Sequence, residues 1–242
     1  MRRFLRSNIV EGFSPMGIIV AVGTPKGGSG KSTLCALLAD TYAGLGWSVV
    51  ILDADRQGSA LQWMAQCEKD GRPPKGVSVV EAAGVETFTA RLDESKSADV
   101  VLIDLPGVLD QMMGLAASRA HLLVIPSRVS MADFREVVKL RNYLRDMFAH
   151  IRPIPMAVAL NGVEGIEPKT AAFKEALAFL QSERVPHMRV MIRSRPVYKT
   201  MIGGVGLSDA PVDPDILKRA KENIQLVADE VLELIQAAGR KA

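Results

Sequence analysis

The feature that most constrains this chain is a glycine-rich turn that lies between an apolar run and a helical pattern. The apolar run covers residues 18–22, the turn reads TPKGGSGKST over residues 24–33, and the helical pattern starts at about Lys31. A short apolar run bounded by turn residues is typical of a buried strand. Backbone N–H groups of such a turn and the positive end of the next helix converge on one point, which suits an anion. The sequence therefore predicts a strand–loop–helix unit that holds phosphate groups.

The turn fits the phosphate-binding loop (P-loop) pattern, with one departure. Its predicted phosphate-binding residues are Gly27, Gly28, Ser29, Gly30, Lys31, Ser32 and Thr33. In such a loop Lys31 reaches the β- and γ-phosphates, and the Ser32 hydroxyl binds Mg²⁺. Pro25 stands where GxxxxGK[ST] has its first glycine, and Lys26 follows it. A chance GKS in an ordinary turn is the alternative, and both flanking elements disfavour it.

Strand-like and helix-like patterns alternate along the rest of the chain. Further strands are expected at 49–52, 77–80, 100–103, 122–125 and 156–160, and long helices at about 31–45, 131–148 and 215–238. Continuously apolar strands separated by helices indicate a parallel sheet that is covered on both faces. We therefore predict an α/β fold with a doubly wound, mostly parallel sheet. In the helix at 131–148, Met131 and Met147 are expected to face inward and Arg141 to face solvent.

Length and composition limit the function classes. The 242 residues suit one large α/β domain, so we expect a flexible arm at 1–16 and a single domain at 17–242. No apolar run approaches the roughly 18 residues of a membrane-spanning helix. The two cysteines, Cys35 and Cys67, show no CxxC spacing, and no leader precedes the first expected strand. A cytoplasmic protein is the expectation.

The loop sequence TPKGGSGKST resembles the deviant Walker A motif of the ParA/MinD family of ATPases. The resemblance implies ATP or ADP with Mg²⁺ as cofactors. It also implies that the extra lysine, Lys26, reaches across a dimer interface to phosphates bound by the other subunit. Lys26 and Lys31 are therefore candidate catalytic residues. A solvated lysine at the loop edge is the alternative for Lys26.

A second segment matches the same family where a strand is expected to end. The stretch VVILDADRQGSA, residues 49–60, resembles the family motif DxDPQGS, with Arg56 in place of the usual proline. By resemblance, Asp55 is a catalytic residue that orients the attacking water and belongs to the metal site. Asp53 would support the strand end and the metal shell. The alternative is that an aspartate in such a place only caps a helix or turn.

A third segment, DVVLIDLPG at residues 99–107, resembles the family's Walker B strand. Asp104 at its end is expected to hold Mg²⁺ through water, which completes a predicted metal site of Ser32, Asp55 and Asp104. A carboxylate buried at a strand end is costly unless it is paired or near a metal, which favours the functional interpretation. Pro106 and Gly107 would let the following loop respond to the γ-phosphate.

Two downstream residues have open interpretations. Asp133 lies in LLVIPSRVSMADF, which resembles the family's strand and helix entry, but Asp133 fits the first turn of a helix equally well. Asn161 ends the run AVALN, at a place where several relatives contact adenine. A turn-forming asparagine is the alternative for Asn161.

The segment RVMIRSRPVYKTMIGGVG, residues 189–206, resembles the C-terminal signature of small partition ATPases. In those relatives the arginine that matches Arg195 contacts DNA phosphates without reading sequence. The candidate DNA-binding residues are Arg193, Arg195, Lys199, Lys218, Arg219 and Lys221. Solvated surface charges are the alternative, because a net charge of +3 does not demand a polyanionic partner.

The resemblance implies a function for the whole chain. With about sixteen residues before the first expected strand, the chain resembles the small, single-domain, ParF-like branch of partition ATPases. Such a protein would form a homodimer with ATP, bind DNA non-specifically, so that it associates with the nucleoid, and hydrolyse ATP when a ParB-like adaptor stimulates it. The alternative is a positioning factor for a protein cluster or for conjugative-transfer machinery.

Two other members of the wider family fit less well. A MinD-like membrane ATPase needs a basic amphipathic tail, but the last expected helix carries Asp229, Glu230 and Glu233 among its polar positions. An iron–sulfur reductase needs bridging cysteines near the Walker B switch, and neither cysteine is there. No membrane partner is therefore expected.

Overall fold

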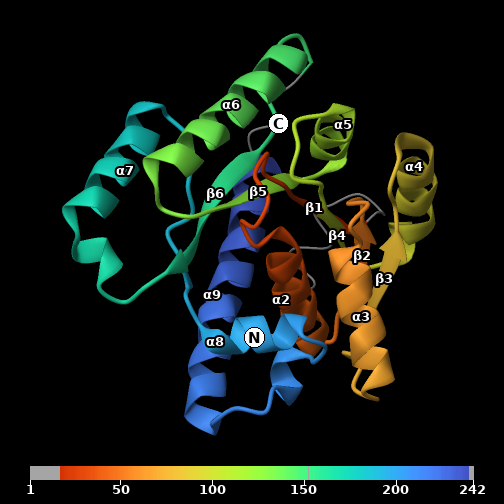
Figure 1. The fold of residues 1–242 in the computed structure, drawn as a ribbon. Helices are drawn as coiled ribbons and strands as arrows, with labels where there is room; N and C mark the ends of the chain where they lie inside the picture. The colour runs from red at the N-terminus through yellow and green to blue at the C-terminus, as the bar shows by residue number, and fades with distance from the viewer. Residues whose placement is uncertain (1–16, 152, 240–242) are drawn as a thin grey trace.

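The centre of the molecule is a parallel sheet that runs through the described part of the chain (Figure 1). The structure is a computed structural model that describes residues 17–151 and 153–239, so the arm expected at 1–16 lies outside the described residues. Across the sheet the strand order is β3-β2-β4-β1-β5-β6-β7. Along the chain the strands are β1 (Ile18–Val22), β2 (Val49–Asp53), β3 (Val77–Glu81), β4 (Val100–Asp104), β5 (Leu122–Ser127), β6 (Met156–Val163) and β7 (Ile192–Arg193).

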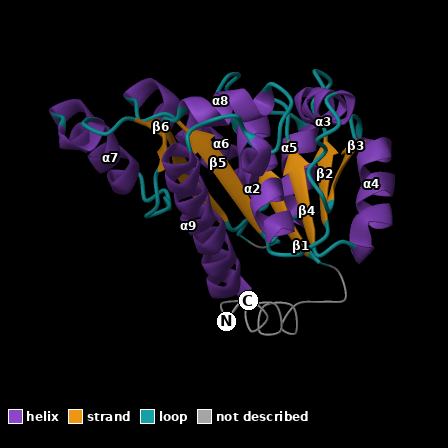
Figure 2. Cartoon of the chain, turned by 90° about the horizontal axis from the view of Figure 1, so that it is seen from below, coloured by secondary structure: helices purple, strands orange, loops and turns teal. Residues whose placement is uncertain are grey.

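Helices cover both faces of this sheet (Figure 2). One face packs against α2 (Lys31–Gly44), α3 (Ser59–Lys69), α8 (Pro196–Ile202) and α9 (Pro214–Gly239). The other packs against α4 (Val85–Glu94), α5 (Gln111–Arg119), α6 (Met131–Met147) and α7 (Ala171–Ser182). Short 3-10 helices lie in the connections: η1 (Ser95–Ser97), η2 (Glu167–Lys169) and η3 (Leu207–Asp209). The predicted doubly wound α/β fold is confirmed.

The apolar strand sequences follow from this double cover. In β1, Ile18, Val20 and Val22 belong to the core under α2 and α9. Ile19 and Ala21 belong to the opposite core. Because successive side chains of a strand point to opposite faces, a strand that is covered on both faces needs an apolar residue at every position.

The long helix α9 has 26 residues and packs along the sheet face that also carries α2 (Figure 1). Its inward residues include Ile224, Val227 and Val231, as the sequence pattern predicts. Its polar face carries charged residues at short intervals. Among the described helices, α9 included, none combines the length and apolar character that a bilayer crossing needs.

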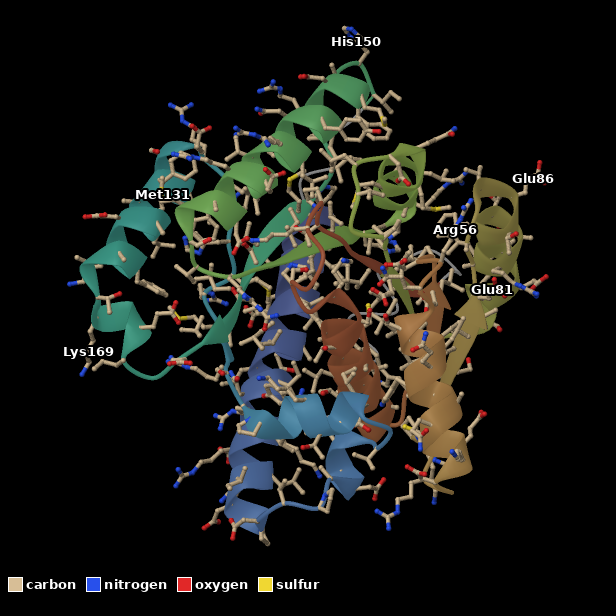
Figure 3. The ribbon with its side chains drawn as sticks, viewed as in Figure 1. Arg56, Glu81, Glu86, Met131, His150 and Lys169 are labelled. Atoms are coloured by element: carbon tan, nitrogen blue, oxygen red, sulfur yellow. The ribbon has the colours of Figure 1, made fainter. Side chains whose placement is uncertain are left out.

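Two details differ from the sequence expectation. Met131 (Figure 3) and Met147 were expected to face inward but are 37% and 44% exposed, because they lie in the first and last turns of α6. Arg141 was expected in solvent, but its Nη1 donates a hydrogen bond of 2.6 Å to the Glu183 carbonyl oxygen after α7. Strand β6 runs three residues past the expected end at 160, because Asn161 and Val163 pair with β7.

Candidate nucleotide-binding site

The P-loop connects the end of β1 to the start of α2, as the sequence predicts. Gly28 and Gly30 have φ angles of 71° and 91°, a left-handed backbone that glycine adopts without strain. Gly30 caps α2 without a side-chain hydrogen bond, and the first turn of α2 has no acidic residue. The N–H groups and the positive end of α2 are therefore available to an anion.

The surface of this loop has room for phosphate groups. A methyl group added at Gly27 or Gly28 would meet no atom of the described residues within 4 Å. The Ser29 hydroxyl is buried and has no hydrogen-bond partner among the described residues. Lys31 is only 8% exposed, so its ammonium group lies inside the site. An open cradle with an orphaned hydroxyl and a buried cation fits a polyphosphate.

The carboxyl ends of β2 and β4 bring two aspartates to the same edge of the sheet. Asp53 is paired in register with Asp104, and Asp104 with Val22, the last residue of β1 before the P-loop. Asp104 is fully buried, and neither of its carboxylate oxygens makes a hydrogen bond of normal geometry to a described residue. Burial raises the pKa of Asp104 to about 7, although the nearby Ser32 hydroxyl and Lys31 lower it. These oxygens and the Ser32 hydroxyl are the hard donors that Mg²⁺ prefers.

Asp53 has a different role from Asp104. Its Oδ2 accepts hydrogen bonds from the backbone N–H groups of Ala60 (2.9 Å) and Leu61 (3.1 Å). Its Oδ1 accepts a hydrogen bond of 3.2 Å from the Asp55 N–H. The expected support of the strand end is therefore present and extends to the start of α3. Oδ1 accepts only one hydrogen bond and keeps a lone pair, so the support of the metal shell by Asp53 stays a prediction.

Asp55 lies just beyond β2, where it is partly exposed. Its Oδ1 accepts a hydrogen bond of 3.0 Å from the Gln57 N–H, which closes an Asx turn. Asp53 and Asp55 are close enough for the negative charge of Asp55 to raise the pKa of Asp53, although burial raises it more. Asp55 thus lies near the sheet edge that carries Asp104, and its roles toward metal and water stay predictions.

The loop after β4 lies directly against the P-loop. A methyl group at Gly107 would be 3.2 Å from the backbone nitrogen of Gly27 and 3.2 Å from Nζ of Lys31. Only a residue without a side chain fits this approach comfortably. The expected switch loop and the phosphate cradle therefore share a contact surface.

Lys26 lies at the outer edge of the cradle and forms an ion pair with Asp133. The Lys26 side chain is 48% exposed, whereas that of Asp133 is 7% exposed. Asp133 occupies the first turn of α6 and accepts a hydrogen bond of 3.0 Å from the Ser130 hydroxyl. Asp133 thus lies at a helix start and also pairs with a P-loop lysine, and its role in the family's pattern stays a prediction. A cavity of about 110 Å³ opens here, lined by Thr24, Lys26, Gly27, Gly28, Ser29, Pro126, Ser127, Arg128 and Asp133.

Asn161 lies beside the P-loop, near the carboxyl end of β6. Its Nδ2 donates a hydrogen bond of 2.7 Å to the Ser29 carbonyl oxygen. A methyl group at Gly30 would lie 2.4 Å from this Nδ2, so Gly30 is needed for space as well as for backbone geometry. Sequence reasoning did not predict this contact with the loop, and the contact with adenine stays a prediction.

The six predicted DNA-binding residues divide into two groups. Arg193, Arg195 and Arg219 line one groove on the surface of α9. Lys199 is exposed on α8, and Lys218 is exposed on α9, but neither lines the groove. Lys221 lies near α2 instead. Burial raises the pKa of Asp40 on that helix, and the charge of Lys221 is close enough to lower it. The structure thus brings three of the six together.

Two curated relatives share part of the sequence. Protein ParA of Rhizobium radiobacter is 33% identical over 119 residues, which is 48% of this chain and 50% of that protein. Chromosome-partitioning ATPase Soj of Thermus thermophilus is 26% identical over 159 residues, which is 55% of this chain and 64% of that protein. The chain thus spans about half of the first relative and under two thirds of the second.

Solved structures share the fold. The MinC:MinD cell division complex of Aquifex aeolicus has a TM-score of 0.69 at 17% identity, covering 90% of this chain and 96% of that chain. Cobyrinic acid a,c-diamide synthase from Mycobacterium smegmatis, with bound ADP and magnesium, has a TM-score of 0.66 at 16% identity, covering 90% and 94%. At these identities the likeness shows the architecture alone.

The family model for CobQ/CobB/MinD/ParA nucleotide-binding domains matches residues 20–236. The matched region includes most of β1, the P-loop, both strand-end aspartates and most of α9. The chain therefore belongs to the CobQ/CobB/MinD/ParA nucleotide-binding family.

Proposed function

We propose that this chain is a Mg²⁺-dependent ATPase of the partition type, which dimerises on ATP and binds DNA without reading its sequence. A ParB-like adaptor stimulates its hydrolysis of ATP. One observation carries the proposal: the open P-loop cradle lies beside Asp104, whose buried oxygens make no hydrogen bond of normal geometry to a described residue. A buried carboxylate of this kind is costly unless a cation completes it.

The P-loop residues bind and orient the triphosphate. The backbone N–H groups of Gly27 to Thr33 surround its oxygens, and Lys31 reaches the β- and γ-phosphates from its buried position. Ser32 and Asp104 would hold Mg²⁺, which would supply positive charge against the phosphate oxygens. Asn161 keeps the Ser29 carbonyl oxygen in place. In this proposal its side chain also contacts adenine.

Asp55 supplies the orientation of the attacking water. It is partly exposed at the edge of the sheet where the metal residues lie, so water can reach it. As a carboxylate, it can accept a hydrogen bond from the water and hold it in line with the γ-phosphate. The neighbouring Asp53 holds the strand end rigid through its three backbone hydrogen bonds.

Lys26 couples nucleotide to dimerisation. ATP can shift a monomer–dimer equilibrium only if it binds the dimer better than the monomer. A lysine from each copy that reaches the phosphates of the other supplies this difference, and hydrolysis removes it. The Thermus thermophilus relative is named a chromosome-partitioning ATPase, which supports a partition role for this chain.

The experiment that tests the proposal is a DNA mobility shift at moderate salt with ADP or with ATP. A shift with ATP but not with ADP is expected, because only the ATP dimer doubles the number of phosphate contacts. Lys31→Ala should lose nucleotide binding and the shift together. Ordinary ATP affinity in Lys31→Ala, or an equal shift with both nucleotides, would contradict the proposal.

A further inference from the structure

A groove of about 450 Å³ lies between α9 and the segment that leads into α8. We call it the arginine groove. Its lining includes Arg189, Arg193, Arg195, Arg219, Glu222 and Asn223. Four arginines face one carboxylate in this lining, so the groove has an excess of positive charge.

The arginines of the groove differ in how well they are paired. Arg189 is already neutralised, since its guanidinium group forms ion pairs with Glu230 and Glu233 of α9. By contrast, Nη1 of Arg193 and Nε of Arg195 are buried and make no hydrogen bond of normal geometry to a described residue, although the Arg195 guanidinium group lies beside the Tyr198 hydroxyl. Buried donors without partners are rare in proteins and indicate a missing acceptor. Both arginine side chains are only partly buried and line the groove, so an anion there can approach the rest of each guanidinium group.

Asn223 fixes the backbone that carries these two arginines. Its Oδ1 accepts a hydrogen bond of 2.9 Å from the Arg193 N–H, and its Nδ2 donates one of 2.9 Å to the Met191 carbonyl oxygen. Strand β7 has only two residues, so pairing with the sheet holds this segment weakly. The side chain of Asn223 therefore takes the place of a neighbouring strand.

We propose that Asn223 is a positioning residue, which holds Arg193 and Arg195 ready for the backbone phosphates of DNA in the arginine groove. The inference rests on the proposed function and adds a residue that the basic sequence pattern does not contain. Arginine binds phosphate through a planar fork of donors, so its orientation matters as well as its charge. A segment that is already ordered loses less conformational entropy when the phosphate binds.

The first test is Asn223→Ala, compared with Gln225→Ala. Gln225 lies on the same helix, makes one side-chain hydrogen bond to Asp229 and does not line the groove. With ATP, Asn223→Ala should bind a short duplex of random sequence about tenfold more weakly, as expected when one charge-assisted hydrogen bond to phosphate is removed. The slope of log affinity against log salt should also fall by about one for each phosphate that the variant no longer binds. The ATP affinity of Asn223→Ala should stay at the wild-type level. The DNA affinity of Gln225→Ala should also stay at the wild-type level.

The salt slope separates positioning from a general loss of stability. A variant that is merely less folded has fewer active molecules, but each one keeps its phosphate contacts and the wild-type slope. If Asn223→Ala shows wild-type affinity, or lower affinity with an unchanged slope, the positioning role is wrong.

Glu222→Gln tests the groove without removing a structural hydrogen bond. Glu222 is exposed on the groove wall, and its charge offsets that of the arginines. We expect DNA affinity to rise severalfold, whereas Glu68→Gln on α3, exposed and outside the groove, should have little effect. Equal effects of the two variants would show that the phosphates bind elsewhere. That result would overturn the inference even if Asn223→Ala does not fold. Wild-type protein that binds no DNA with ATP would overturn both the proposed function and this inference.

Discussion

Lys26 and Asp133 form an ion pair within one chain, although they lie 107 residues apart in sequence. The lysine proposed to act on the phosphates of a partner copy is thus held beside its own P-loop by a carboxylate at the start of α6. Any movement of Lys26 across an interface has to break this pair. The monomer therefore contains a contact that would compete with the proposed ATP dimer.

Asp133→Asn should lower the ATP concentration needed for dimerisation. Lys26 is half exposed, so the pair contributes only about 1 kcal/mol in each copy, which corresponds to a severalfold change. Light scattering during an ATP titration measures the effect. Glu136→Gln is the matched control, because Glu136 pairs with Lys139 on the same helix, away from the cradle. An unchanged midpoint in Asp133→Asn, or a dimer that persists in Lys26→Ala, would count against this account.

Gly27→Ala should separate nucleotide binding from folding. The added methyl group meets no described atom within 4 Å, so the melting temperature without nucleotide should hardly change. The same methyl group occupies the space of the phosphates, and weakening one N–H hydrogen bond to a charged oxygen lowers ATP affinity about tenfold or more. Gly165→Ala, which also meets nothing within 4 Å, is the control. Calorimetry with ATP would refute the cradle if both variants bound equally well.

Asp55→Ala should keep the protein in its ATP-bound form. Without the carboxylate that orients water, single-turnover hydrolysis should slow about a hundredfold or more, while ATP binding remains. The neighbouring Arg56, exposed in Figure 3, provides the control variant Arg56→Ala, which should hydrolyse ATP normally. Wild-type turnover in Asp55→Ala would remove its role toward water.

Asp40 should make stability depend on pH. Burial raises the pKa of this α2 carboxyl to about 6; Asp209 also raises it, and Lys221 and the Leu207 N–H lower it. Between about pH 4 and pH 6 the folded protein binds a proton that the unfolded chain has released. The free energy of unfolding should therefore fall as pH rises through this window, by roughly 2–3 kcal/mol in total.

Urea unfolding at a series of pH values measures this slope. Asp40→Asn should be flatter over the same window and more stable than wild type near neutral pH. Parallel curves for the two proteins would show that Asp40 does not titrate as described.

The sequence was sufficient for those features that depend on local patterns. The P-loop and the strand ends at Asp53 and Asp104 follow from apolar periodicity and turn residues close by in the chain. The contacts of Lys26 with Asp133 and of Asn161 with Ser29 could not be predicted this way. They join residues 107 and 132 positions apart, and they depend on how the loop after β5 and the end of β6 pack around the cradle.

The sequence does contain a signal that separates the basic residues that line the arginine groove from those that do not. Arg219, Glu222, Asn223 and Leu226 follow the spacing of one helix face, which is the face that lines the arginine groove. Lys218 and Lys221 fall outside this lining. The predicted set of DNA-binding residues was chosen without this helical periodicity. It therefore combined residues of the arginine groove with residues outside it.

Asn161 also has a position that matters for the molecule as a whole. Its side chain holds the Ser29 carbonyl of the P-loop, while its backbone pairs with Ile192, the residue before Arg193. One hydrogen bond and one strand pairing thus join the phosphate cradle to the segment that enters the arginine groove. A single residue therefore connects the proposed ATP site to the segment that is proposed to bind DNA.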